Sequence, residues 1–136
     1  MANMDLRTIK FRGYNKKRGI WLYGNYILNR GAHFIAPQEF ADGKTWEDYE
    51  VEEESIGQFT GLTDKNGKEI YEGDILEELD TRLLVKVVYD APMFCYADNE
   101  FGYRFLNLPK NFRVMGKYYD DVEYWTEILH RQGGKL

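Results

Sequence analysis

The 136-residue sequence has few of the residues on which several kinds of functional site depend. Cys95 is the only cysteine, so a disulfide within the chain and a four-thiolate zinc site are both excluded. The two histidines, His33 and His130, lie far apart and match no His-x-x-x-His metal spacing. No apolar run approaches the roughly 18 residues of a transmembrane helix, and the charged opening residues do not fit a signal peptide. We therefore expect a cytoplasmic protein without a membrane segment.

Aromatic residues are abundant, at 16% of the chain, and they favour a mainly β fold because their side chains fit a pleated, half-buried surface. Residues 6–14 and 20–28 come close to the alternation of half-buried strands, and the polar stretch between them ends in glycine. This pattern predicts a β-hairpin with Lys16, Lys17 and Arg18 at its tip. Residues 29–48 lose this periodicity, and we expect an irregular excursion there.

The second half of the sequence predicts short strands separated by turns. Asn66-Gly67 suits a tight hairpin, and Gly73-Asp74 leads directly into an apolar segment. Further strands are predicted at residues 82–89, 93–96, 103–108 and 112–119. Apolar residues at helical spacing predict a short helix within residues 121–132. We therefore expect an N-terminal β lobe at residues 1–58 and a small barrel at residues 59–136, with one compact domain as the alternative.

Charge is distributed unevenly behind a net value of −5. Residues 1–30 carry seven basic groups against Asp5 alone, whereas residues 47–54 contain six acidic groups. Such segments can pair within one chain, pair between subunits, or present a basic face to an anionic partner. A calcium site among the carboxylates is disfavoured, because no Asp-x-Asp-x-Asp-Gly loop is present. Tyr49 and Val51 instead indicate the start of a strand beside a solvated acidic face.

Residues 58–76 read QFTGLTDKNGKEIYEGDIL, and this run resembles the signature of the YopX family of phage and prophage proteins. Residues 7–14 and 112–119 are similar to the opening and closing motifs of that family. Gly13 and Tyr14 depart from its usual Ala-Trp, and residues 29–54 match it poorly. The resemblance implies an SH3-type barrel in the C-terminal part. The resemblance implies no particular activity and assigns no catalytic residues.

Two kinds of binding remain as hypotheses, with an enzyme third, since the sequence offers no catalytic set and no cofactor motif. The favoured hypothesis is a protein-interaction module or homo-oligomer. Its candidate interface is acidic and consists of Glu50, Glu52, Glu53 and Glu54. The alternative is a nucleic-acid-binding accessory protein, in which cations grip phosphates and aromatic rings stack on bases. Its candidate contacts are Arg12, Lys16, Lys17, Arg18 and Trp21.

Overall fold

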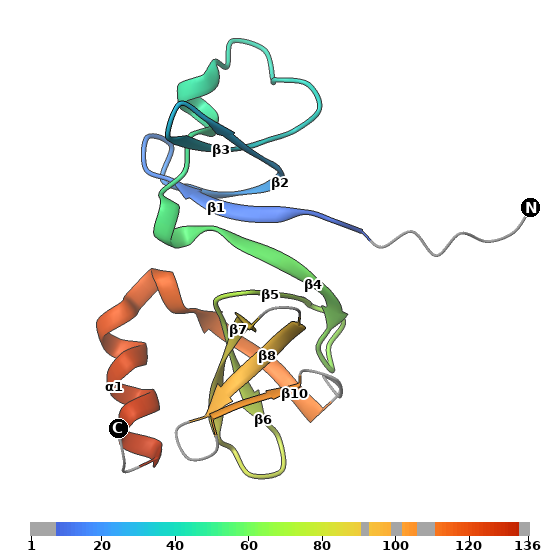
Figure 1. The fold of residues 1–136 in the computed structure, drawn as a ribbon, viewed down its shortest axis with the longest axis vertical. Helices are drawn as coiled ribbons and strands as arrows, with labels where there is room; N and C mark the ends of the chain where they lie inside the picture. The colour runs from blue at the N-terminus through green and yellow to red at the C-terminus, as the bar shows by residue number, and fades with distance from the viewer. Residues whose placement is uncertain (1–7, 91–92, 99–101, 106–110, 134–136) are drawn as a thin grey trace, which may run out of the picture. The chain divides into compact units, whose positions relative to one another are not determined.

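The computed structural model describes residues 8–90, 93–98, 102–105 and 111–133, and Figure 1 shows their path. The chain divides into two compact units, residues 1–61 and 62–136. The boundary expected from the sequence lies between residues 58 and 59. Two antiparallel sheets contain the strands, which confirms the predicted mainly β class.

The first unit is built on the predicted hairpin. Residue 15 of β1 faces residue 20 of β2, so the three cations occupy the connecting turn, as predicted. The strand order is β3-β2-β1-β4, and β4 crosses the unit boundary and continues the order to β5. The strands of this unit are β1 (Phe11–Asn15), β2 (Ile20–Asn29), β3 (Ala32–Ala36) and β4 (Gly57–Thr63).

Strand β2 is long because it pairs with two different strands along its length. Its first half pairs with β1 and its second half pairs with β3. Gly24 lies at the change of partner with a φ of 157°. A Cβ there would lie 2.7 Å from the carbonyl oxygen of Ala36. Glycine is therefore required at this position, because only a residue without a side chain lets the two backbones approach so closely.

The expected irregular excursion is partly wrong, because residues 32–36 form strand β3 within it. Arg30 and Gly31 both have positive φ, the conformation of a two-residue hairpin turn, and they return the chain onto β2. An aromatic cluster then orders the loop that follows. Phe40 lies between Trp46 and Tyr49, with ring centroids 4.9 and 4.5 Å away.

The strand start expected at Tyr49 and Val51 is also wrong, because residues 47–54, which we call the acidic segment, fall mainly in two 3-10 turns. These turns are η1 (Trp46–Tyr49) and η2 (Glu53–Ser55). Between the two turns, the backbone of the acidic segment forms hydrogen bonds with two strands, β1 and β3. Val51 N–H donates to the carbonyl of His33 on β3 at 2.9 Å, and Glu52 N–H donates to the carbonyl of Tyr14 on β1 at 3.0 Å.

This bridging closes one side of the first unit. Tyr14 N–H donates to Oγ of Ser55, directly after the acidic segment, so both polar groups of the Tyr14 backbone are satisfied by Glu52 and Ser55. Val51 is 4% exposed and lies against Gly13, whose Cα has no side chain to compete for the space. The acidic segment is therefore fixed against the strands of its own unit.

The second unit contains a five-stranded antiparallel sheet in the order β10-β6-β7-β8-β9. The predicted strands and both predicted turns are present, although residues 106–108 of one expected strand lie outside the described ranges. Among the described residues, no strand pairing closes this sheet, so the expected SH3-type barrel is not confirmed. The strands are β5 (Glu69–Tyr71), β6 (Asp74–Glu78), β7 (Leu84–Asp90), β8 (Met93–Asp98), β9 (Gly102–Phe105) and β10 (Phe112–Lys117).

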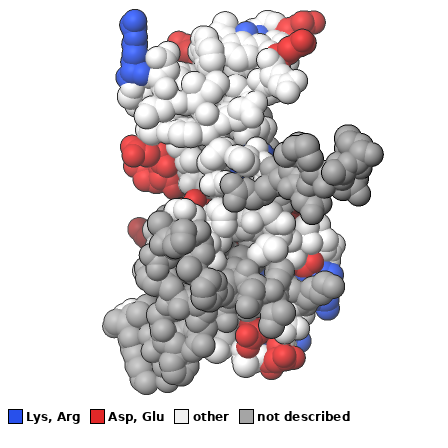
Figure 2. Space-filling model, turned by 45° about the vertical axis from the view of Figure 1, so that its right-hand side comes forward, with Lys and Arg blue, Asp and Glu red and all other residues white. Residues whose placement is uncertain are grey.

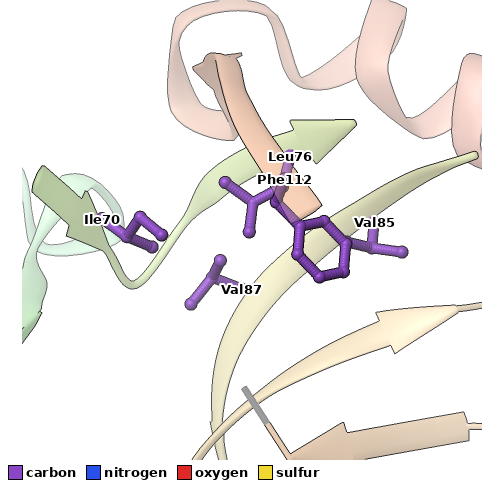
Figure 3. Close-up of a cluster of buried hydrophobic side chains, with 5 residues drawn as sticks. All are labelled: Ile70, Leu76, Val85, Val87 and Phe112. Atoms are coloured by element: carbon purple, nitrogen blue, oxygen red, sulfur yellow. The ribbon is translucent and has the colours of Figure 1, made fainter. Parts of the chain in front are cut away.

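Side chains from β5, β6, β7 and β10 form the core of the second unit, as Figure 3 shows. None of them is more than 4% exposed. Burial of a side chain of this size contributes about 1.5–3 kcal/mol, so the cluster provides a large share of the stability of the unit. Its members are Ile70, Leu76, Val85, Val87 and Phe112.

The predicted C-terminal helix is confirmed as α1 (Val122–Gly133), which follows the turn η4 (Tyr118–Asp121). Two contacts hold α1 to the sheet. Trp125 lies against Gly116 of β10, where a Cβ would be only 2.8 Å from the indole ring. Gln132 pairs with the backbone of Leu84 through both its amide oxygen and its amide nitrogen. None of the described helices has the length and apolar character needed to span a bilayer.

Candidate interaction surface on the N-terminal unit

The basic tip, defined as Lys16, Lys17 and Arg18, contacts the acidic segment of the same chain. Nζ of Lys17 lies 3.1 Å from Oδ1 of Asp48. Nζ of Lys16 lies 3.2 Å from a carboxylate oxygen of Glu52. Arg18 donates from Nη1 to the backbone carbonyl of Asp48 at 3.2 Å. Of the three ways in which the opposite charges could pair, the structure realises the pairing within one chain.

A buried asparagine fixes the tip in this position. Asn15 is only 1% exposed, and its Oδ1 accepts the backbone N–H of Arg18 at 2.7 Å. Its Nδ2 donates to the carbonyls of Glu47 at 3.1 Å and Glu50 at 2.6 Å. The side chain thus ties the tip turn to the acidic segment. Sequence reasoning missed this role, for which the only signal was an asparagine at the start of a turn.

The pairing also changes the acid–base properties of its members. The backbone N–H of Thr45, followed by the ammonium of Lys17, lowers the pKa of the Asp48 carboxyl below its ordinary value. The hydrogen bond to Asp48, with smaller contributions from Glu47, raises the pKa of Lys17. Each shift widens the pH range over which the group stays charged.

Arg12 and Trp21, the other two candidate nucleic-acid contacts, lie together on neighbouring strands. The Arg12 guanidinium lies over the Trp21 ring, 5.2 Å from its centroid. Arg12 is only 3% exposed, and the ring of Trp21 packs edge-on against Tyr14 at 5.7 Å. The structure therefore brings these two residues together but leaves the Arg12 side chain almost no exposed surface.

The four candidate interface glutamates have different surroundings. Glu52 is half-buried and forms the ion pair with Lys16. Glu53 is exposed, and its carboxylate lies 3.6 Å from Nε2 of His33. The other ring nitrogen of His33 is 2.7 Å from the hydroxyl of Tyr26. Glu50 and Glu54 are both exposed. The acidic segment therefore uses part of its charge internally and presents the rest to solvent.

Trp46 is the feature of this region that sequence reasoning missed. It is 50% exposed, although its ring makes edge contacts with Phe34 at 5.0 Å and Phe40 at 4.9 Å. Two neighbouring rings thus limit the orientation of a tryptophan that still has half its surface in solvent. The signal was present as Trp46 next to Glu47, but the sequence alone could not separate an exposed ring from a buried one.

Charge on the visible surface is local rather than continuous. On the face of Figure 2, the described acidic and basic side chains form small separate groups among uncharged residues. Within the described part of the chain, no group of three or more histidine, cysteine or acidic side chains is placed to hold a metal ion.

Comparison with protein families identifies a match over residues 10–128 to the family described as YopX protein. The chain belongs to the YopX family. Comparison with curated proteins gave no match. The crystal structure of protein EF1440 from Enterococcus faecalis is similar, with a TM-score of 0.58 and 22% sequence identity. The similarity covers 86% of this chain and 97% of EF1440, and at this identity it supports the fold alone.

The YopX-like signature at residues 58–76 has a structural explanation. Asp64 is 5% exposed, and its Oδ1 accepts the backbone N–H groups of Asn66 and Lys68, which shapes the β4-β5 hairpin. Its Oδ2 accepts the N–H of Val114 on β10 at 2.9 Å. Asp74 is 1% exposed and accepts the N–H of Tyr71 at 2.8 Å. Both carboxylates accept hydrogen bonds from backbone N–H groups, which gives these two residues of the signature a structural role.

Proposed function

We propose that this YopX-family chain is a non-catalytic protein-interaction module, and that its N-terminal unit binds a basic protein partner through Trp46 and the acidic segment. Trp46 is the observation that carries the proposal. A large ring that is oriented by its neighbours and still half exposed loses little conformational entropy on binding. Such residues are enriched among those that dominate interface energies.

The charge of the acidic segment, which follows Trp46 in the sequence, defines the chemistry of the partner. Glu47, Glu50, Glu53 and Glu54 of the same segment are exposed. Arginine side chains suit this combination, because a guanidinium stacks on an indole and pairs with carboxylates. The tip of a second copy is a weaker partner, because its cations already contact their own acidic segment. We also propose that the protein is cytoplasmic and of phage or prophage origin.

Anisotropy of two fluorescein-labelled peptides of equal length tests this proposal. One peptide is rich in arginine and the other is rich in glutamate. We expect the arginine-rich peptide to bind in a salt-sensitive manner and Trp46→Ala to weaken its binding at least tenfold. Tyr124→Ala is the matched control, since Tyr124 is 51% exposed in the other unit. Equal binding by wild type and Trp46→Ala would contradict the proposed role of Trp46.

Nucleic-acid binding by the basic tip is the second candidate. The side chains of Lys16 and Lys17 are 69% and 53% exposed, so a phosphate can still reach them from the solvent side. Competition from the acidic segment weakens this hypothesis, because the ammonium groups of both lysines are already paired with carboxylates of the same chain.

Anisotropy of labelled single-stranded DNA, duplex DNA and RNA at low and moderate salt decides between the candidates. Neutralising the whole tip to glutamine should abolish binding if the tip grips phosphate. The matched control neutralises Arg30, Lys65 and Lys68, three exposed cations outside the tip. Salt-sensitive binding that only the tip variant loses would support the nucleic-acid candidate. Failure of the wild-type chain to bind any of the three nucleic acids would exclude it.

A further inference from the structure

The outward side of α1 carries two parallel rows of side chains. Residues four apart lie almost one helical turn from each other and so form rows along the helix surface. The first row contains Val122, Thr126 and His130, and the second contains Glu123, Glu127 and Arg131. A hollow of about 660 Å³ lies along this side, and its described lining consists of these six residues.

This surface is distinct from the side of α1 that packs on the sheet. Trp125 and Gln132 point to the sheet, where they contact Gly116 and Leu84. Val122 is 44% exposed, and the surface of the hollow is mostly apolar. The helix therefore presents the row of Val122, Thr126 and His130 beside a charged row to solvent.

The charged row is complementary to itself in one orientation. Its acidic members lie in the first half of α1 and Arg131 lies near the end. Within one chain, Arg131 donates to the Glu127 carboxylate at 2.5 Å, and both side chains are about two-thirds exposed, at 67% and 68%. A parallel copy would place like charges opposite each other. An antiparallel copy places the acidic part of each helix against the basic part of the other.

We propose that a second copy of this chain packs its α1 antiparallel against this surface, around a two-fold axis level with Leu129. An axis at that position sets Glu127 of each copy opposite Arg131 of the other. Each carboxylate has two oxygens and can accept a guanidinium from its own chain and one from the second chain. The contact is isologous, as in most two-fold dimers. This inference goes beyond the proposed function, since it uses neither Trp46 nor the acidic segment.

Sedimentation velocity over a concentration series tests the contact. The wild-type chain should form a species of twice the 16.1 kDa chain mass. Glu127→Arg places arginine at both positions, and Arg131→Glu places glutamate at both positions. Each variant alone should therefore raise the dimer dissociation constant at least tenfold. Asp80→Arg, a charge reversal on an exposed turn of the same unit, should leave it unchanged.

An equimolar mixture of Glu127→Arg and Arg131→Glu provides the decisive measurement. In the mixture, arginines of one chain face glutamates of the other, so a mixed dimer of wild-type strength should form. Disruption of the pair within each helix cannot produce this result, because that disruption persists in the mixture. Circular dichroism confirms that both variants are folded. A wild-type chain that stays monomeric, variants that dimerise like wild type, or a mixture that remains monomeric would each overturn the proposal.

Discussion

Replacing Gly13 with alanine tests whether the acidic segment lies where it closes the first unit. The new Cβ would lie 2.8 Å from both Cβ and Cγ2 of Val51 and 2.9 Å from its Cγ1. Carbon atoms in contact prefer about 3.5–4.0 Å. Val51 has little freedom to move, since its N–H is hydrogen-bonded to His33 and its side chain is 4% exposed. We expect Gly13→Ala to destabilise the protein by about 1–3 kcal/mol.

Val51→Ala supplies the second half of a double-mutant cycle. It removes two methyl groups, at a cost of about 1.6 kcal/mol by area bookkeeping, and it also removes two of the three clashing atoms. The double variant should therefore be more stable than the sum of the two single changes by about 1 kcal/mol or more. Urea unfolding followed by tryptophan fluorescence gives the four free energies.

The control combines Gly13→Ala with Val87→Ala, which opens the same kind of space in the core of the other unit. Those two changes should add, because distant sites do not share atoms. Additivity of the Gly13 and Val51 changes as well would refute the contact between the strand and the acidic segment. Gly13 stands where the YopX motif that the sequence resembles has alanine, and the contact with Val51 leaves no room for a Cβ there. An alanine there needs a smaller residue at position 51 or a different path for the segment.

Three further predictions concern charge, backbone strain and the helix. The pKa of Asp48 is lower in the folded protein than in the unfolded chain, where it is roughly 3.9. The ionised carboxylate therefore stabilises the fold above that unfolded-state pKa, and the stabilisation is lost as the pH falls through the folded-state pKa. Asp48→Asn should thus lower the melting temperature at neutral pH and flatten its decline in acid. Arg30 has a φ of 53°, and Arg30→Asn should raise stability by up to about 1 kcal/mol in thermal melts. Gln132→Ala leaves the peptide groups of Leu84 without their side-chain partner, and should speed amide exchange there and destabilise the protein by about 1–2 kcal/mol.

The parts of the fold that the sequence predicted correctly depend on local signals. The first hairpin follows from alternating residues around a polar turn, and the β4-β5 turn follows from Asn66-Gly67. Helix α1 follows from apolar residues at helical spacing, of which Trp125 packs on the sheet. In each case a few neighbouring residues are enough to select the conformation, so distant contacts did not have to be known.

The parts that the sequence missed depend on distant contacts. Strand β3 has only five residues and no clear alternation, and it is a strand because β2 continues past β1 to receive it. The conformation of the acidic segment depends on hydrogen bonds to residues 14, 15 and 33, which lie far away in the sequence. The orientation of the exposed Trp46 ring depends on Phe34 of β3 as well as on the nearby Phe40. No short window of sequence contains all of these partners.

The uneven charge of the sequence is partly balanced by contacts between oppositely charged segments. The basic tip has three cations and the acidic segment has six carboxylates, and the structure sets them against each other. The basic tip and the acidic segment together therefore carry a net negative charge. The sequence alone had suggested a basic face for the tip. A polyanion that approaches the tip meets this negative charge within about a Debye length, which is ~8 Å at physiological salt. A cationic partner is attracted by the same charge, which is why we propose a basic protein rather than a nucleic acid as the partner.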